Sequence, residues 1–313
     1  MHPVLIDSLT GLASLALLFS GAELLVRAAV DIGLRLKLSP LIVGLTIVAF
    51  ATSAPELVVS VQAALKGTGA IALGNVFGSN LANLGLILGL SAMITPMAVD
   101  RFSVRVDGPV MFGVSLLAGW FAWSGEVARW QGFVLFALLM GYLVFRIRLA
   151  RRHAAAEVPV EGVPDQPRWS WAVAIMMLLA GLGLLVAGGD LLVRAGSSLA
   201  ATLGMPQSFI ALTLVAVGTS LPELATSLVA AARKQADIAV GNVLGSNIFN
   251  VTCVLGLSAL TTPLKGDPLG FEIGAMLVIS LGVLPLLRTG HRVERWEGAL
   301  LLLAYLGVIA LAA

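Results

Sequence analysis

The chain contains two copies of one segment. Residues 21–96 align with residues 188–263 at a constant offset of 167 positions, without a gap. Between residues 44 and 96 roughly half of the aligned positions are identical, and the identities include Thr, Ser, Pro, Glu, Asn and Gly. Chance similarity between apolar segments would not preserve so many polar residues, so the repeat indicates a duplication. The fold must therefore consist of two related halves.

Each half is rich in apolar stretches that are long enough to cross a lipid bilayer. Of the 313 residues 58% are hydrophobic and only 12% are charged, whereas a soluble domain carries about 25% charged residues. About 20 apolar residues cross the hydrocarbon core. No basic cluster precedes the first apolar stretch, so we expect it to be a span and not a cleaved signal peptide. We predict an all-α polytopic membrane protein with ten spans, at residues 8–29, 39–65, 70–95, 107–124, 130–149, 169–195, 206–232, 237–262, 269–287 and 296–312.

Each half is predicted to span the membrane five times. Because five is odd, the second half enters from the opposite face, and the halves should be related by a two-fold axis in the membrane plane. Inverted repeats of this kind are typical of transporters, whose substrate sites lie near the midplane between the repeats. We therefore predict a first five-helix repeat (residues 1–149), a short polar linker (150–168) and a second, inverted repeat (169–313).

The basic residues predict the orientation in the membrane. The odd-numbered connections between spans hold 15 of the 19 Lys and Arg residues, and the even-numbered connections hold the other four. Basic residues concentrate in cytoplasmic loops. We therefore expect the odd-numbered connections and the linker to be cytoplasmic and both termini to lie outside.

A polar motif interrupts the second and the seventh predicted spans. Residues 51–56 read A-T-S-A-P-E and residues 218–223 read G-T-S-L-P-E. A proline inside a helix removes one amide donor and displaces the carbonyl four residues earlier. Carbonyls freed in this way are tolerated at membrane depth only where they face protein or a polar cavity. Helical spacing lets Thr52 and Ser53 reach the turn that carries Glu56. Carboxylate, hydroxyl and carbonyl oxygens together suit hard cations such as Ca²⁺ and Na⁺.

A second motif lies in the third and the eighth predicted spans. Residues 74–83 read G-N-V-F-G-S-N-L-A-N, and residues 241–250 read G-N-V-L-G-S-N-I-F-N. Two glycines and three asparagines within ten residues weaken an ordinary helix. We predict a broken helix in which Ser79 and Asn83, four residues apart, lie on one face.

A cation site explains these motifs better than helix mechanics does. A proline kink can be purely mechanical, and small polar residues also serve helix packing. However, both halves carry the same carboxylate, Glu56 and Glu223, and no Lys or Arg lies inside a predicted span near Glu56. Two buried carboxylates repel each other unless a cation lies between them. We therefore predict a site for a hard cation.

The remaining polar residues have simpler interpretations. The pairs Glu23–Arg27 and Asp190–Arg194 have helical i,i+4 spacing, and we expect them to be structural ion pairs. The single cysteine, Cys253, excludes a disulfide within the chain and a multi-thiolate metal site. The three histidines lie at chain ends or in loops, which argues against zinc ligation and against a proton relay.

The two motifs and their second copies resemble the α-repeats of the Ca²⁺/cation antiporter superfamily, most closely its prokaryotic sodium/calcium exchangers. The resemblance covers essentially the whole chain. It implies alternating access around four central sites, one for Ca²⁺ and up to three for Na⁺, with spans 1 and 6 sliding across the other eight. It also implies a prokaryotic cytoplasmic membrane. The metal ligands that it implies are the Ala49 and Ala216 carbonyls with Thr52, Ser53, Glu56, Ser79, Asn83, Thr219, Ser220, Glu223, Ser246 and Asn250.

Asn250 departs from part of that superfamily. Archaeal exchangers and the potassium-dependent branch carry aspartate at this position, whereas both copies of the motif end here in asparagine, as in the animal sodium/calcium exchangers. The predicted site then holds two formal negative charges, those of Glu56 and Glu223. This leaves no extra charge to hold K⁺ and leaves the Na⁺ stoichiometry open.

Three functions remain at this stage. The first is an electrogenic, K⁺-independent Na⁺/Ca²⁺ antiporter, which is not an enzyme and needs no prosthetic group. The second is a Ca²⁺/H⁺ antiporter, in which the two glutamates would exchange protons for Ca²⁺. The third is a Ca²⁺ channel, which would need a ring of carboxylates from several chains. Two inverted copies complete a site within one chain, so we expect a monomeric functional unit. The expected partners are Ca²⁺, Na⁺ and the bilayer, and no nucleic acid.

Overall fold

The computed structural model describes residues 3–153, 166–202, 218–266 and 268–312. Within these residues, seven helices are long and apolar enough to cross a membrane, and a bent pair of helices adds an eighth. The chain is a multi-pass helical membrane protein. The first half contains α1 (Pro3–Leu36), α2 (Pro40–Val43), η1 (Gly44–Val48), α3 (Ala49–Thr52), α4 (Ala54–Leu65), α5 (Gly69–Ala82), η2 (Asn83–Ile87), α6 (Leu88–Ile94), η3 (Ser103–Asp107), α7 (Gly108–Ala122) and α8 (Arg129–His153).

The second half repeats this order. It contains α9 (Trp171–Thr202), α12 (Leu221–Ala232), α13 (Ala236–Phe249), η6 (Asn250–Val254), α14 (Leu255–Thr261), α15 (Gly270–Arg288) and α16 (Arg295–Ala312). Most predicted spans coincide with helices to within a few residues. Two predicted spans are not among these eight. The helix formed by η3 and α7 is not counted as long and apolar enough to cross a membrane. Residues 206–217 of the predicted seventh span lie outside the described residues, which leaves α12 with 12 residues. Eight spans are thus described, and the count of ten stays a prediction.

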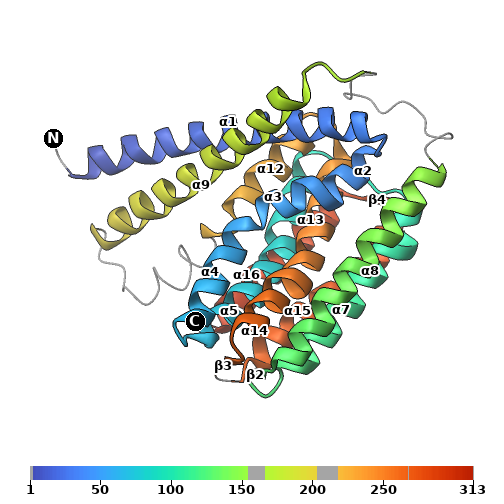
Figure 1. Cartoon of the computed structure of the whole chain (residues 1–313). Coiled ribbons are helices and arrows are strands. Elements are labelled where there is room, and N and C mark those ends of the chain that lie inside the picture. Colours follow the sequence, from blue (N-terminus) through green and yellow to red (C-terminus); the bar gives the residue numbers. More distant parts are fainter. Residues whose placement is uncertain (1–2, 154–165, 203–217, 267, 313) are drawn as a thin grey trace.

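The two glycine- and asparagine-rich spans form the centre of the molecule. In their most apolar windows 72% of α5–α6 and 89% of α13–α14 is buried by the protein, against 33% for α1 and 28% for α9. The two outer helices lie side by side across the others (Figure 1). At about 1.5 Å per residue, the 34 residues of α1 exceed the thickness of a bilayer core. Helix α1 must therefore be tilted or project from the membrane.

The halves are interlocked at the centre. Helix α13 of the second half packs against η1, α2 and α3 of the first. Likewise α12 packs against η2 and α6, and α4 packs against η6 and α14. Two glycines make the first of these contacts possible: a Cβ on Gly44 would lie 2.5 Å from the Ile238 carbonyl oxygen, and a Cβ on Gly241 would lie 2.6 Å from that of Leu41. The polar motifs of each half therefore meet those of the other.

The sequence prediction of a broken helix at residues 74–83 is wrong. A single helix runs over Gly69–Ile94, and it widens into a π-helical turn, η2, from Asn83 onward. The glycines of the second copy serve close packing between helices, as Gly241 does against Leu41. Tertiary packing thus outweighs the low helix propensity of glycine and asparagine.

Two short antiparallel strand pairs also join the halves. Strand β1 (Met97–Ala98) pairs with β4 (Arg292–Val293), and β2 (Glu126–Val127) pairs with β3 (Leu264–Lys265). The two pairs lie at opposite ends of the helix bundle (Figure 1). An offset of 167 relates β1 to β3 and an offset of 166 relates β2 to β4, so the duplication exchanges one strand pair for the other.

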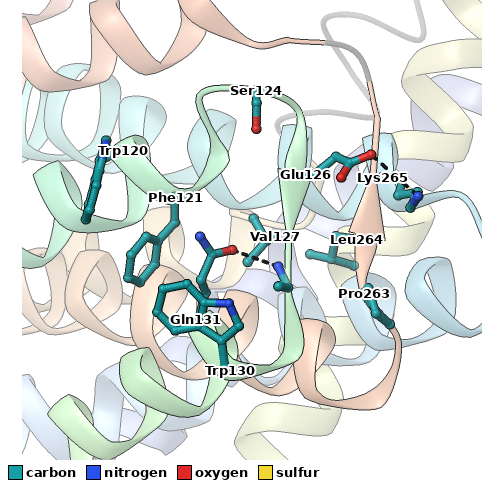
Figure 2. A pocket seen from close by; sticks show the side chains of 11 residues that line it. Trp120, Phe121, Ser124, Glu126, Val127, Trp130, Gln131, Pro263, Leu264 and Lys265 are labelled. Atoms are coloured by element: carbon teal, nitrogen blue, oxygen red, sulfur yellow. Dashed lines mark hydrogen bonds and ion pairs between the residues drawn. The ribbon is translucent and has the colours of Figure 1, made fainter.

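The β2–β3 pair borders an open surface pocket of about 410 Å³. Figure 2 shows Trp120, Phe121 and Trp130 on one side of it and the ion pair between Glu126 and Lys265 on the other. Both tryptophans are exposed. Tryptophan side chains concentrate at the two surfaces of a membrane, so this end of the bundle fits the membrane–water boundary.

Candidate cation-binding site

The predicted kink at Pro55 separates two helices. Helix α3 ends at Thr52, α4 begins at Ala54, and their axes differ by 44°. The linking residue, Ser53, has φ −81° and ψ 2°. Ser220 has nearly the same backbone conformation, φ −87° and ψ 5°, and precedes α12. The equivalent prolines thus start equivalent helices, and proline is favoured in the first turn because an amide donor there has no partner within the helix.

The two glutamates lie in the first turns of these helices. Glu56 belongs to α4 and Glu223 to α12, and the side chains are 0% and 1% exposed. A helix N-terminus carries a partial positive charge, which stabilises a carboxylate there. This interaction is smaller than the cost of burying two ionised carboxylates at membrane depth. Each glutamate therefore needs further partners.

Part of that stabilisation comes from the opposite half. Ser53 donates a hydrogen bond from Oγ to Glu223 Oε1 at 3.0 Å, and Ser220 donates one to Glu56 Oε1 at 3.3 Å. Ser53 is three residues before Glu56 in the chain, so these two bonds bring both carboxylates to one place. The two motifs therefore meet in the structure.

Two asparagines that the sequence analysis did not assign complete this arrangement. The Thr219 hydroxyl donates to Asn75 Oδ1 at 3.1 Å, and the Asn75 amide donates to Ser60 Oγ at 2.9 Å and to the Glu56 carbonyl at 3.2 Å. Two of these bonds go to α4, the helix that carries Glu56, and the third joins Asn75 to Thr219 of the opposite half. Asn75 therefore positions residues of both motifs.

Asn242 makes the equivalent contacts in the other direction. The Thr52 hydroxyl donates to Asn242 Oδ1 at 3.2 Å, and the Asn242 amide donates to Ser227 Oγ at 2.9 Å and to the Glu223 carbonyl at 3.4 Å. The helical spacing could have revealed this role, because residues 75, 79 and 83 are each four apart and share one face.

Another bond joins identical positions of the two halves. Asn80 donates its amide to the Asn247 carbonyl oxygen at 3.1 Å, and the two residues are 167 positions apart. Equivalent residues of a duplicated structure can touch each other only near the axis that relates the halves. Such an axis would therefore pass close to Asn80 and Asn247, near the C-terminal ends of α5 and α13.

Several buried atoms around the motifs have no hydrogen-bond partner among the described residues. A buried polar atom without a partner costs about 1–3 kcal/mol, and a charged one costs more. A hard cation accepts carboxylate, hydroxyl and amide oxygens as ligands, so this set fits Ca²⁺ or Na⁺. The oxygen atoms of the set are Glu56 Oε2, Glu223 Oε2, Ser79 Oγ, Ser246 Oγ, Asn83 Oδ1 and Asn250 Oδ1.

The asparagines at the end of the second motif have a particular backbone setting. Asn83 begins the π-helical turn η2, and Asn250 begins η6. Both side chains are buried, and among the residues that the structure describes neither the oxygen nor the nitrogen of either amide has a hydrogen-bond partner. A π-helical turn widens a helix locally and often marks a functional site. The wider turn changes the direction of the asparagine side chain, and the helix continues through it.

The family resemblance implies two backbone carbonyls as ligands, those of Ala49 and Ala216. The Ala49 carbonyl accepts a hydrogen bond from the Ser53 amide at 3.0 Å, and the Thr52 hydroxyl oxygen lies 3.4 Å from it. Ala216 lies outside the described residues. Within the described residues, no ion pair links Glu56 or Glu223 to a Lys or Arg.

A buried ion pair that the sequence analysis missed lies apart from these motifs. Arg146 of α8 contacts Asp107 at 3.0 Å, and both side chains are almost fully buried. Asp107 also accepts hydrogen bonds from Ser103 at 2.6 Å and from Tyr142 at 2.8 Å. Both carboxylate oxygens therefore have protein partners, and the charge is balanced by Arg146.

The two predicted i,i+4 ion pairs are confirmed. Arg27 contacts Glu23 at 2.5 Å and Arg194 contacts Asp190 at 2.9 Å. Glu23 also pairs with Arg233, which joins α1 to the end of α12. They stabilise helices and their packing and do not reach the site.

The sequence as a whole matches known proteins. The family model described as sodium/calcium exchanger protein matches residues 8–148 and 173–313. The chain belongs to the sodium/calcium exchanger family. The two matched segments coincide closely with the two halves of the duplication.

Relatives extend over the full length. The putative antiporter CaxA of Alkalimonas amylolytica is 37% identical over 97% of this chain and 98% of the relative. The sodium/calcium exchanger MaX1 of Methanosarcina acetivorans is 32% identical over 98% of each chain. A solved structure of the sodium-calcium exchanger NCX_Mj, soaked without Na⁺ and Ca²⁺, matches with a TM-score of 0.83 and 30% identity, over 99% of this chain and 100% of that one. The likeness therefore includes fold and sequence together.

Proposed function

We propose that the chain is a secondary antiporter that exchanges Na⁺ for Ca²⁺ across a membrane by alternating access. The observation that carries this proposal is the pair of buried glutamates, each hydrogen-bonded by a serine of the opposite half and each with a second oxygen that has no protein partner. Two such carboxylates repel each other when the site holds no cation. One Ca²⁺, or several Na⁺ ions in its place, removes that repulsion.

The ligands of the proposed site are the twelve residues implied by the family resemblance. Glu56 and Glu223 supply the charge, and the hydroxyls of Thr52, Ser53, Ser79 and their equivalents supply neutral oxygens. Asn250 adds a neutral amide oxygen and no charge. Two glutamates balance one Ca²⁺, whereas three Na⁺ ions leave the site with one net positive charge. Exchange of three Na⁺ for one Ca²⁺ is therefore electrogenic. The site has no third carboxylate that would hold a K⁺ ion in addition.

The proposed architecture is two inverted repeats of five spans, over residues 1–149 and 169–313, joined by the linker 150–168. The bond between equivalent residues Asn80 and Asn247 and the exchange of the two strand pairs by the duplication both support it. A two-fold axis that runs through the centre and exchanges opposite ends of the bundle is the axis of an inverted repeat. Together with the distribution of Lys and Arg, this arrangement supports our proposal that both termini lie outside a prokaryotic cytoplasmic membrane.

The proposed moving parts are α1 and α9. They pack mainly against each other and bury much less of their surface than the central spans do. Sliding of this pair across the body would expose the central oxygens first to one side and then to the other. One chain supplies both halves of the site, so the proposed functional unit is a monomer.

The experiment is ⁴⁵Ca uptake into liposomes that contain the purified protein and are loaded with Na⁺. Three Na⁺ leave for each Ca²⁺ that enters, so one positive charge moves outward per cycle. An interior-positive potential, set with valinomycin and a K⁺ gradient, should therefore speed uptake, and an interior-negative one should slow it. The driving force changes by about 2.3 kcal/mol per charge per 100 mV.

Three outcomes of this assay would contradict the proposal in different ways. Uptake that follows an imposed pH gradient and ignores Na⁺ would assign the protein to Ca²⁺/H⁺ exchange. Uptake that depends on Na⁺ but not on the potential would replace three-for-one exchange by an electroneutral two-for-one cycle. An absolute K⁺ requirement, tested with choline in place of K⁺, would show that Asn250 does not have the role given to it.

A further inference from the structure

A cavity of about 240 Å³ lies at one end of α1, away from the proposed ion site. It is bounded by α1, by the residues that lead into α9 and by the turn that follows α12. Three arginines line it, one from each of these segments: Arg27, Arg168 and Arg233. The cavity therefore collects positive charge from three parts of the chain that are distant in sequence.

The acidic residues near the cavity do not neutralise this charge. Glu23 engages Arg27 and Arg233 through a single oxygen, Oε1. A guanidinium has five N–H donors, so both arginines keep donors for another ligand. Four arginines, counting Arg35, face two carboxylates here, Glu23 and Asp31, which leaves a formal charge of +2.

Asp31 lines the cavity, but both of its oxygens are already used. Oδ2 accepts from Arg35 at 3.0 Å, and Oδ1 accepts the backbone amides of Arg168 and Trp169. This arrangement fixes the backbone of Arg168 beside α1. Within the described residues no acidic group pairs with the Arg168 guanidinium, and the side chain is exposed. Arg168 is therefore a positioned arginine with its donors free.

The other wall of the cavity is apolar. Val26, Val30 and Leu34 lie on one face of α1, at helical spacings of four, and Trp169 lies beside them. An arginine cluster next to an apolar helix face at the end of a membrane span matches a lipid at the level where its phosphate meets its acyl chains. Basic pockets between membrane helices bind anionic headgroups for this reason.

We propose that this cavity binds the phosphate group of an anionic phospholipid. Arg168 and the free donors of Arg27 and Arg233 would contact the phosphate oxygens, since arginine binds phosphate through two parallel N–H donors. The apolar wall would contact the glycerol and the first methylenes. The proposal concerns lipid binding alone, so its test does not depend on which ions the protein exchanges.

The test measures ligand-induced stabilisation of the full chain, purified in a neutral detergent. The thermal midpoint of unfolding is followed while dihexanoylphosphatidylglycerol, dihexanoylphosphatidylcholine or inorganic phosphate is added at constant ionic strength. A ligand that binds only the folded state raises the midpoint in a saturable way. We expect a saturable rise with the anionic lipid and none with the zwitterionic lipid.

Two matched variants locate the effect. Arg168→Gln removes an exposed arginine without breaking a described ion pair, so the protein should fold. Loss of charge-assisted hydrogen bonds should weaken the apparent affinity at least about tenfold. Arg288→Gln removes an exposed arginine from another predicted cytoplasmic connection and should leave the affinity unchanged. Native mass spectrometry of the same samples counts the bound lipid directly.

Each alternative outcome is decisive. An equal rise in all three proteins would overturn the site, because the lipid would act as a general anionic amphiphile. A rise with inorganic phosphate and none with the anionic lipid would overturn the lipid source and assign the cavity to a free phosphoanion. A similar rise with the zwitterionic lipid would show that the arginines do not select the ligand.

Discussion

The hydrogen bond between Thr219 and Asn75 offers a direct test of how the two halves are held together. It joins the first motif of one half to the second motif of the other at 3.1 Å, at partly buried positions. We predict that a double-mutant cycle with Thr219→Val and Asn75→Ala shows a favourable coupling between the two side chains. Such a cycle isolates the pairwise interaction from the other effects of each substitution.

The magnitude follows from the contacts. A neutral hydrogen bond contributes a net of about 0.5–1.5 kcal/mol, and bonds between membrane helices average about 0.6 kcal/mol with a maximum near 1.7 kcal/mol. We therefore expect a coupling of about 0.5–1.5 kcal/mol. Asn75→Ala alone removes three hydrogen bonds, those to Thr219, Ser60 and the Glu56 carbonyl. It should lower the free energy of unfolding by about 2–4 kcal/mol.

The assay is reversible unfolding in mixed micelles, followed by the signal of the folded state. The equivalent cycle, Thr52→Val with Asn242→Ala, serves as an internal replicate. It tests the equivalent hydrogen bond in the other direction, which is 3.2 Å long. The exchanged cycle, Thr52→Val with Asn75→Ala, is the control, since no hydrogen bond joins these two side chains. If the exchanged cycle couples as strongly as the matched ones, the cross-half bonds do not account for the stability, and the reasoning fails.

Three further predictions concern the ion site, the topology and the buried ion pair. Glu56→Gln or Glu223→Gln should abolish ⁴⁵Ca transport but leave the protein folded, because each removes a buried charge from an unpaired carboxylate; near-normal flux would refute the site. In a Cys253→Ala background, single cysteines that replace residues in the loops should react with an impermeant thiol reagent from one side of the membrane only. If cysteines at positions 66 and 105 are labelled from the same side, the inverted arrangement is refuted. The cytoplasmic positions are Arg105 and Arg152, and the outer positions are Lys66 and Lys265. Arg146→Met should lower the free energy of unfolding by about 3–5 kcal/mol, because it leaves a buried carboxylate unpaired; adding Asp107→Asn should recover part of this loss, and a further loss in its place would contradict the ion-pair explanation.

The sequence predicts the parts of this fold that depend on local composition and on the duplication. Apolar length places most helices to within a few residues, and Pro55 marks the kink because proline cannot donate the missing hydrogen bond. The repeated glutamates also predict the centre of the site, since a carboxylate that appears twice inside an apolar span requires a partner. These inferences need no knowledge of the tertiary arrangement.

The parts that the sequence does not predict depend on contacts between distant segments. Glycine and asparagine propensities suggest a break at residues 74–83, but the glycines of such a segment can also serve close packing, as the contact of Gly241 with Leu41 illustrates. Asn75 lies on the same helical face as Ser79, yet its bond to Thr219 requires knowing how the halves meet. The Asp107–Arg146 pair has no counterpart in the other half, where offsets of 166 and 167 place Ile273 and Gly274 opposite Asp107. Without a repeated signal, nothing links the two residues beforehand.

The two small strand pairs have a mechanical consequence for the proposed exchanger. Each pair ties one half to the other by backbone hydrogen bonds, one pair at each end of the bundle, and none of the strands belongs to α1 or α9. Rotation that separates the two halves at one end of the bundle would have to break the strand pair at that end. The strand pairs therefore oppose a hinge motion of one half against the other. The remaining freedom is shear of a two-helix layer over a rigid block. For the proposed exchanger we therefore expect the α1–α9 layer to move over the block and the distances among the proposed cation ligands to change little through the cycle.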